Sequence, residues 1–334
     1  MMALLSSLVA FLVTLALIWP LRKLALHLDI LDDPGPRKIH TDPVPYLGGL
    51  AMLGGLTCAV LWLRPEWWSV VVMLASITAM GLVDDVRFLP VWLKLVGEGT
   101  VACCAVALGF SWHLSDSVGL NAGFSVLWIV GLTNSFNLLD NMDGLASTVA
   151  ALSLIAFAAL VPAAAMFAAP VAGAAIGFLL INRPRAKMYM GDAGSLMLGF
   201  GVALCSIGAA NSSHGLHSTV LLVVPVAVAL FDTLLVIVSR LAAGRPIQLG
   251  GKDHFSHRLR LLGWSPHQVL AAAAVGSIAA WGLASLAIRF PSPDAWLAVP
   301  IGLAFVITWA RLLRVDPYTA TVPQPLEVHH AGAI

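Results

Sequence analysis

Acidic and amide side chains gather in one short stretch, residues 134–144, which lies between two long apolar runs. Asn134, Asn137 and Asp140 recur every three residues, close to one helical turn, so they lie near one face of a helix as it ends. Asp143 follows at the same spacing. Carboxylate and amide oxygens in this arrangement suit Mg²⁺ or the hydroxyls of a sugar phosphate. The alternative is a polar loop in which Asp143 caps the next helix, which does not explain the amides upstream.

A second acidic group is the adjacent pair Asp84 and Asp85, at the end of another apolar run. Two neighbouring carboxylates repel one another unless a cation or a proton lies between them. A helix-end pair neutralised by Arg87 is the alternative interpretation. Placement of this pair on the same membrane face as residues 134–144 favours a shared site.

A glycine-rich turn, residues 191–195, leads into a further helix. Backbone N–H groups at a helix start bind phosphate, and Asp192 beside them can hold the metal ion that shields it. Tyr189 could stack on a nucleobase. Three basic residues precede the turn: Arg183, Arg185 and Lys187. Taken alone, the turn is also a common helix N-cap signal.

Two basic loops complete the set. Residues 33–49 contain four prolines, which hold the loop extended, and Lys38 in it could contact an anion or simply anchor the chain at the membrane surface. The late loop carries His254, His257 and Arg258, which suit a diphosphate. A structural zinc ion is the rival for the two histidines, but no cysteine lies nearby to complete its ligands. Asp232, inside the preceding apolar run, is either a buried helper or a satisfied polar residue.

The composition indicates which elements must position these loops. Of 334 residues, 59% are hydrophobic and only 10% are charged, whereas a soluble domain carries about a quarter charged residues. So few charges cannot cover a water-facing surface, which predicts an all-α polytopic membrane protein embedded in a lipid bilayer. The net charge of +1 gives no basic field for nucleic acid. All four cysteines fall inside apolar runs and are assigned to packing.

A spanning helix needs about 20 mostly apolar residues, and about eleven candidates are present. We expect them at 3–21, 46–63, 67–83, 91–110, 122–139, 144–161, 163–181, 193–210, 216–239, 267–288 and 294–312. The first is interpreted as a retained span, because no basic segment precedes it. Residues 1–315 form one domain, and residues 316–334 are predicted to be a disordered tail.

Lysine and arginine predict the orientation. Alternate junctions between the spans hold sixteen basic residues against two, Arg64 and Arg289, which places the first set in the cytoplasm and the N-terminus outside. The acidic clusters share the cytoplasmic face, so the chemistry is expected there. A transporter would instead carry its functional polar residues near the centres of the spans. The outer spans would allow a homodimer, but nothing in the sequence selects one.

Taken together, these loops resemble the polyprenyl-phosphate N-acetylhexosamine-1-phosphate transferase family of bacterial cytoplasmic membranes. The resemblance covers roughly residues 20–265. It rests on the order of the Asp84–Asp85 pair, the 134–146 stretch, the 187–195 run and the late His loop. The late motif is closer to the O-antigen and teichoic-acid branch, which transfers GlcNAc-1-phosphate, than to the phospho-MurNAc-pentapeptide branch. Ser256 stands where the former branch often has a histidine.

The resemblance implies a role for each matching residue. Asp192 would ligate Mg²⁺, or Mn²⁺ in its place, assisted by Asn137. Asp84 and Asp85 would lie by the lipid phosphate, one of them as a base. The remaining roles are orientation of the nucleotide sugar by Asp140 and Asp143, stacking of Tyr189 on uracil, and contacts to the substrates by Lys38, Asn134, Lys187, His254, His257 and Arg258.

The implied reaction transfers N-acetylhexosamine 1-phosphate from a UDP-sugar to undecaprenyl phosphate and releases UMP, as a first membrane step towards lipopolysaccharide or teichoic acid. The alternative within the family is the phospho-MurNAc-pentapeptide transferase reaction of peptidoglycan synthesis. A CDP-alcohol type of lipid-phosphate transferase is weaker, because Asp143-Gly-Leu-Ala is followed by Ser147 rather than by the arginine of that motif.

Overall fold

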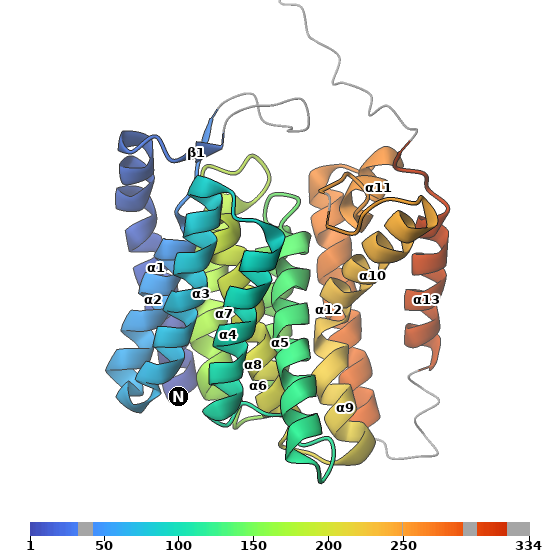
Figure 1. The fold of residues 1–334 in the computed structure, drawn as a ribbon, viewed down its shortest axis with the longest axis horizontal. Helices are drawn as coiled ribbons and strands as arrows, with labels where there is room; N and C mark the ends of the chain where they lie inside the picture. The colour runs from blue at the N-terminus through green and yellow to red at the C-terminus, as the bar shows by residue number, and fades with distance from the viewer. Residues whose placement is uncertain (33–42, 249, 290–298, 319–334) are drawn as a thin grey trace, which may run out of the picture.

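Long helices run side by side through the computed structural model, which describes residues 1–32, 43–248, 250–289 and 299–318 (Figure 1). The α-helices are α1 Met2–His27, α2 Gly48–Leu63, α3 Trp68–Arg87, α4 Val91–Ala107, α5 Val118–Leu139, α6 Leu145–Leu160, α7 Ala165–Asn182, α8 Gly191–Ala210, α9 Gly215–Val223, α10 Ala227–Ala242, α11 Phe255–Leu261, α12 Pro266–Arg289 and α13 Val299–Leu313. Two 3-10 turns, η1 Pro65–Trp67 and η2 Val224–Val226, extend α3 and join α9 to α10. The strands β1 Leu31–Asp32 and β2 Val44–Pro45 pair antiparallel, with Leu31 opposite Pro45.

The predicted all-α polytopic class is confirmed. Among the described residues, seven helical segments are long and apolar enough to cross a membrane, with α9, η2 and α10 forming one of them, Gly215–Ala242. Three further apolar helices are shorter. Each of the eleven ranges expected from the sequence coincides with helix where the structure describes it, although the number of helices that span a bilayer stays a prediction.

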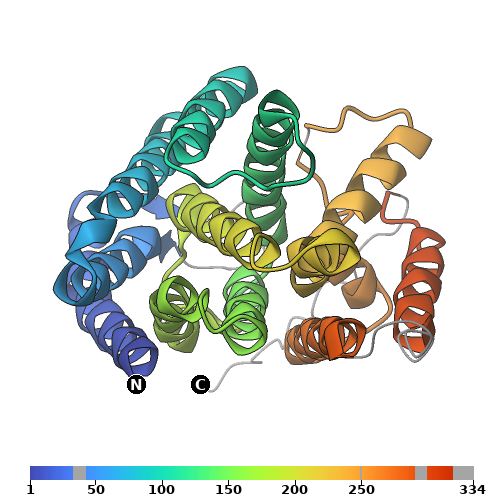
Figure 2. The ribbon, with the colours of Figure 1, turned by 90° about the horizontal axis from the view of Figure 1, so that it is seen from below.

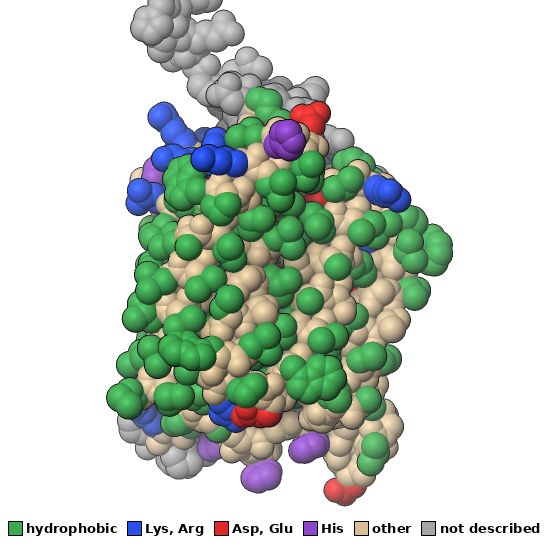
Figure 3. All heavy atoms as spheres, turned by 90° about the vertical axis from the view of Figure 1, so that its left-hand side faces the viewer, with side chains coloured by type: hydrophobic (Ala, Val, Ile, Leu, Met, Phe, Trp, Pro, Cys, Tyr) green, Lys and Arg blue, Asp and Glu red, His purple; other side chains and the backbone are tan. Residues whose placement is uncertain are grey.

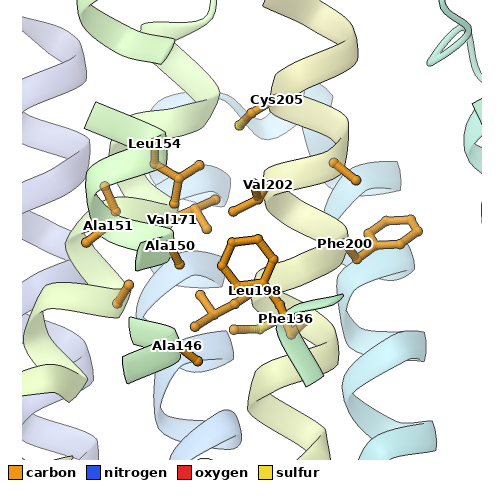
Figure 4. Packing of buried hydrophobic residues seen from close by; sticks show 14 of the residues in the cluster. Phe136, Ala146, Ala150, Ala151, Leu154, Val171, Leu198, Phe200, Val202 and Cys205 are labelled. Atoms are coloured by element: carbon orange, nitrogen blue, oxygen red, sulfur yellow. The ribbon is translucent and has the colours of Figure 1, made fainter. Parts of the chain in front are cut away.

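Helix α8 forms the centre of the bundle, and Figure 2 shows the other helices around it. Every residue of α8 except Asp192 and Gly208 is buried. Apolar side chains of α5, α6 and α7 pack against it (Figure 4): Phe136, Ala146, Ala150, Ala151, Leu154 and Val171 lie on the side of α8 that carries Leu198, Val202 and Cys205, whereas Phe200 points to the other side. Burial of Cys205 agrees with its predicted packing role, whereas Cys58, Cys103 and Cys104 are exposed and do not pack inside the bundle.

Two glycines let α2 and α3 approach the start of α8 at backbone distance. A Cβ atom on Gly81 would lie 2.5 Å from the backbone nitrogen of Ala193, and one on Gly49 would lie 2.4 Å from that of Gly194. Small residues at helix contacts are the usual means of close packing in membranes. The first turn of α8, which carries Asp192, is therefore held by direct contact with α2 and α3.

The polar loops of the sequence lie at one end of the bundle. The chain starts at the opposite end, and β1, α11 and the connections α3–α4, α5–α6 and α7–α8 lie together at the top of Figure 1. Figure 3 shows lysine and arginine side chains gathered at this end above a largely hydrophobic middle. Segments from distant parts of the sequence thus meet at one polar surface, which we call the loop end.

Candidate active site

A cavity of about 1040 Å³ opens among the segments of the loop end. Its lining comes from seven separate stretches of the chain, from β1 to the start of α12. Its charged and hydrogen-bonding lining residues are Asp32, Tyr46, Asp85, Asn137, Asp140, Asn141, Asp143, Asn182, Arg185, Tyr189, Asp192, His257 and His267. Seven residues assigned to the site from the sequence are therefore together in one cavity.

Asp192 lies at the start of α8, at the floor of this cavity. Its Oδ1 atom accepts a hydrogen bond of 2.8 Å from the amide of Asn137, and its Oδ2 atom lies 2.9 Å from Nζ of Lys94. Asn137 also donates to Oγ of Ser195 at 3.0 Å. The predicted pair Asp192 and Asn137 is thus in direct contact.

Lys94 contacts two acidic residues of the site, although in the sequence it was counted only among the sixteen basic residues that predict the orientation. Its Nζ lies 2.7 Å from Oδ2 of Asp84 and 2.9 Å from Oδ2 of Asp192, so one cation joins two carboxylates from different helices. The available signal was a lysine inside an apolar run with Glu98 one helical turn later.

The two adjacent carboxylates of α3 have different partners. Oδ1 of Asp84 accepts the N–H of Leu89 at 2.6 Å, and its Oδ2 faces Lys94. Asp85 accepts the N–H groups of Asp192 at 2.8 Å and Ala193 at 3.2 Å, so it caps the first turn of α8 from another helix. Both oxygens of each carboxylate therefore have donors.

Asn134 is separated from Asn137, although their spacing put them near one face. Its amide donates to the carbonyl of Val130 at 2.9 Å and to the buried carboxylate of Glu98 on α4. Asn134 is absent from the cavity lining given for the described residues. Asn134 therefore connects α5 to α4 through Glu98 and does not line the cavity.

The loop between α5 and α6 places its acidic residues in the cavity wall. Burial, and then the negative charge of its acidic neighbours, Asp192 foremost, raise the pKa of Asp140 to about 8. Asp143 accepts the N–H of Ala186 at 2.9 Å. The N-cap of α6 is Gly144, and its N–H donates to Oδ1 of Asn182 at 2.9 Å. Asp143 is therefore not the N-cap residue of this helix.

Residues 45–49 form backbone hydrogen bonds with the segment that precedes α8. The N–H of Tyr189 donates to the carbonyl of Pro45 at 2.9 Å. The N–H of Gly48 donates to the carbonyl of Tyr189 at 3.0 Å. Tyr46 donates its hydroxyl to Asp32 at 2.6 Å, and its ring centroid lies 6.3 Å from that of Tyr189. The two tyrosines therefore form an aromatic side of the cavity.

The basic residues assigned to the site are not all in the cavity. Arg185 lines it, whereas Lys187 is exposed and lines a smaller neighbouring cavity of about 330 Å³. Lys38 lies outside the described residues. Arg258 is fully buried, and its guanidinium donates to the carbonyls of Asp253 and Leu312, at 2.9 Å each, and to Val315 and Ser239. This differs from the predicted phosphate contact of Arg258, because every guanidinium nitrogen is used to attach the late loop to α10 and α13.

The two histidines of the late loop occupy different positions. His257 lines the cavity, and burial, together with the nearby His254, lowers its pKa to about 4, so the ring is neutral at physiological pH. His254 is buried behind it, and its Nδ1 atom lies 2.8 Å from Oδ2 of Asp232. Asp232, for which the sequence left two roles open, is thus a bonded partner of a predicted site residue.

The carboxylate and amide oxygens of this cavity fit Mg²⁺ only in combination with a substrate. Within the part of the chain that the structure describes, no three His, Cys, Asp or Glu side chains form a ready metal-binding group. Mg²⁺ is usually held by one or two carboxylates together with phosphate oxygens and water rather than by a protein cage. Asp192, with Asn137 beside it, has the donor chemistry for this arrangement.

Residues that follow α13 contact the late loop and the end of α10. Tyr318 donates its hydroxyl to Asp253 at 3.0 Å, and the guanidinium of Arg245 lies 4.1 Å from the centroid of its ring. Of the tail predicted for residues 316–334, the structure describes only residues 316–318. Residues 319–334 lie outside the described residues.

Comparison with known proteins agrees with this geometry. The model of glycosyl transferase family 4 matches residues 67–210. A probable undecaprenyl-phosphate N-acetylglucosaminyl 1-phosphate transferase of Bacillus subtilis is 31% identical, over 92% of this chain and 90% of that protein. A decaprenyl-phosphate N-acetylglucosaminephosphotransferase of Mycolicibacterium smegmatis is 34% identical, over 90% and 86%. A phospho-N-acetylmuramoyl-pentapeptide-transferase of Lactobacillus gasseri is 30% identical, over 72% and 83%.

The apolar bundle with a polar cavity at one end defines a multi-pass membrane protein, and these relatives are transferases. The chain belongs to glycosyl transferase family 4. The family predicted from the order of the loop motifs is confirmed.

Proposed function

We propose that this protein transfers GlcNAc-1-phosphate from UDP-GlcNAc to undecaprenyl phosphate and releases UMP. The observation that carries the proposal is Asp192, which lines a cavity of acidic, amide and aromatic side chains and is paired with Lys94, the lysine that also binds Asp84. The names of the Bacillus and Mycolicibacterium relatives support the sugar and the polyprenyl phosphate acceptor.

In the proposed reaction, an oxygen of the lipid phosphate attacks the β-phosphorus of the UDP-sugar. The bond between that phosphorus and the bridging oxygen breaks, and the electron pair leaves with UMP. Since the second pKa of a phosphate monoester is about 6, the nucleophile is already largely ionised, and a strong general base is not required. The occupied oxygens of Asp84 and Asp85 agree with this, because each already accepts hydrogen bonds.

The side chains of this chain then serve to bring two anions together. The ammonium of Lys94, paired with the lining residue Asp192, lowers the repulsion between the acidic side chains and the phosphates. His257, neutral at physiological pH, offers a hydrogen bond rather than a charge. Tyr189 and Tyr46 provide the aromatic side on which uracil would stack. Mg²⁺, held by Asp192 with Asn137, would supply additional positive charge against the phosphate oxygens.

The surroundings of the reaction follow from the fold. The polyprenyl chain would remain in the bilayer while its phosphate reaches the loop end. The excess of lysine and arginine in the loop-end junctions supports a cytoplasmic active site in a bacterial cytoplasmic membrane. Labelling of single cysteines introduced near Lys23 and near Glu66, in intact cells and in lysed cells, tests this orientation.

Transfer is tested with the purified full chain in detergent, undecaprenyl phosphate, Mg²⁺ and UDP-GlcNAc labelled in the sugar. We expect a labelled lipid product and an equal amount of UMP. Chelation of the metal should stop the reaction, and added Mg²⁺ should restore it. Asp192→Asn should abolish UMP release while the protein remains folded in detergent.

The Lactobacillus relative favours a second donor, UDP-MurNAc-pentapeptide. Its match covers a smaller share of this chain than the matches of the GlcNAc transferases, which is why UDP-GlcNAc is placed first. The same assay with both donors separates the two reactions. Lipid product from neither donor, with folded protein and Mg²⁺ present, would refute the proposed function.

A further inference from the structure

Asp232 is a fully buried carboxylate on α10 that lies outside the cavity but is bonded to the loop that lines it. Its Oδ2 atom lies 2.8 Å from Nδ1 of His254. Its Oδ1 atom accepts the N–H of Phe255 at 2.7 Å. One side chain thus fixes both the ring of His254 and the first turn of α11.

The contact with a carboxylate selects one form of the His254 ring. A carboxylate accepts hydrogen bonds, so Nδ1 of His254 must carry a proton that it donates to Asp232. The same carboxylate satisfies an N–H group at the start of α11, a helix of 7 residues. A helix this short is not stable by itself and depends on such contacts.

The position of α11 determines where His257 lies in the cavity. The ring centroids of His254 and His257 are 5.7 Å apart, and His257 is a lining residue. Ser256, between them, donates to Oδ1 of Asn141 in the acidic loop. A shift of His254 or of the first turn of α11 would therefore displace both His257 and the contact to the acidic loop.

We propose that Asp232 is a positioning residue for the transfer reaction, which acts through His254 and the first turn of α11 to place His257 in the cavity wall. The effect on turnover rests on the proposed function. The effect on the His254 ring does not, because it concerns the protein without substrate.

A second residue of α10, Arg240, also binds the late loop, so a purely structural role of Asp232 must be distinguished from positioning of His254. Arg240 binds Asp253 through two hydrogen bonds of 2.7 and 2.8 Å, one residue before His254. That ion pair holds the loop backbone but contacts neither histidine. If Asp232 served only to hold the backbone, its effect on activity would not depend on the presence of His254.

The proposal is tested first by nitrogen NMR of the full chain, labelled in its histidine side chains and purified in detergent. The resonances of His254 are assigned by their loss in His254→Gln. In the wild-type protein we expect Nδ1 to carry a proton that is hydrogen-bonded to Asp232. Asp232→Asn should alter this pattern, because an amide can offer a donor to Nδ1, and Asp232→Glu should retain it.

Transfer activity is then compared in Asp232→Asn, His254→Gln and the double variant. We expect each single change to lower kcat by about 10- to 100-fold, the range for partners that orient a functional histidine. The double variant should be no slower than His254→Gln, because Asp232 acts through that ring. Thr233→Val, next to Asp232 and of the same shape, should leave the rate and the NMR pattern unchanged.

Two results would overturn the proposal. The first is an unprotonated Nδ1 of His254 in the wild-type protein, a result that needs no variant to fold. The second is a double variant that loses the product of the two single losses, which would indicate separate structural contributions. If the wild-type protein transfers no sugar phosphate, the proposed function fails, and the NMR result still decides whether Asp232 fixes His254.

Discussion

The ammonium group of Lys94 lies 2.9 Å from Oδ2 of Asp192, although 98 residues separate the two in the sequence. The same ammonium lies 2.7 Å from Oδ2 of Asp84. Lys94 therefore neutralises the charge that would otherwise keep α3 and the start of α8 apart. It also places a positive charge next to Asp192, a lining residue of the cavity where two phosphate groups are expected to meet.

Replacement of Lys94 by methionine should lower transfer by at least about 100-fold, the usual loss when one preorganised cationic or donor group is removed from a reacting anion. Lys94→Arg should recover part of the rate, because it keeps the charge but not the shape of the ammonium. The measurement is lipid-linked product formed per minute from labelled UDP-GlcNAc.

Lys23→Met is the matched control for this change. Lys23 is exposed near the end of α1 that lies at the loop end of the bundle, and it is not a lining residue of the cavity. Its replacement removes an equal charge from the loop end and should not change the rate. Equal losses in the two variants would show that the general charge of the surface, rather than the Lys94 contact, supports turnover.

Asp85 is predicted to act on the start of α8 rather than as a base. Asp85→Asn keeps one acceptor but turns an N–H donor towards the N–H groups of Asp192 and Ala193. Loss of such a cap should lower the free energy of unfolding by about 1–2 kcal/mol and reduce transfer, because Asp192 moves with the turn. The midpoint of thermal unfolding in detergent and the transfer rate check the two effects.

Asp116→Asn provides the comparison for Asp85→Asn, since Asp116 is exposed in the connection between α4 and α5. Replacement of Asp116 should change neither the midpoint of thermal unfolding nor the transfer rate. A normal unfolding midpoint for Asp85→Asn, combined with complete loss of transfer, would instead assign Asp85 to the chemical step.

The positions of the helices could be predicted from the sequence because apolar length is a local property. The expected range 144–161 corresponds to α6, Leu145–Leu160, within one residue at each end. The first helix continues to His27, six residues beyond the expected end at 21, since the basic residues after that point can extend into the surface region while the backbone stays helical.

The contacts within the site could not be predicted in the same way. Lys94 has the sequence pattern of a membrane-surface anchor, and only the fold brings Asp192 to it. The spacing of Asn134 and Asn137 predicted one shared face, but Asn134 donates to Glu98 on α4, whereas Asn137 donates to Asp192 and Ser195 on α8. Partners far apart in the chain decided these roles, and one sequence does not contain their pairing.

Gly81 is predicted to be essential for the close approach of α3 and α8. A Cβ atom there would lie 2.5 Å from backbone atoms of Asp192 and Ala193, which cannot move without displacing the first turn of α8. Gly81→Ala should therefore destabilise the protein by about 1–3 kcal/mol and lower transfer. Thermal unfolding and product formation are measured together.

Gly99→Ala is the control for the glycine experiment, because a Cβ atom on Gly99 in α4 meets nothing within 4 Å. Since alanine is the better helix former, this change should leave the protein as stable as before or raise its stability by up to about 1 kcal/mol. Loss of stability in both variants would show that helix propensity, and not the contact with α8, governs the result.

The neutral state of His257 predicts how stability depends on pH. Its pKa is lowered from 6.5 to about 4, mainly by burial, so the unfolded chain binds a proton more readily than the folded protein does. The stability present above pH 6.5 should therefore be lost as the pH falls from 6.5 towards 4. The expected loss is up to about 3 kcal/mol by the linkage relation. In His257→Gln this part of the pH dependence should vanish, because glutamine does not titrate.

The thermal midpoint of the wild-type protein, His257→Gln and His214→Gln is measured over this pH range. His214, exposed in the connection between α8 and α9, should leave the wild-type curve unchanged when replaced. The difference between wild type and His257→Gln isolates His257, since every other acidic group of the site titrates in both proteins. Parallel curves for these two proteins would mean that His257 can take up a proton in the folded state, and its proposed role as a neutral hydrogen-bonding group at the phosphates would then be wrong.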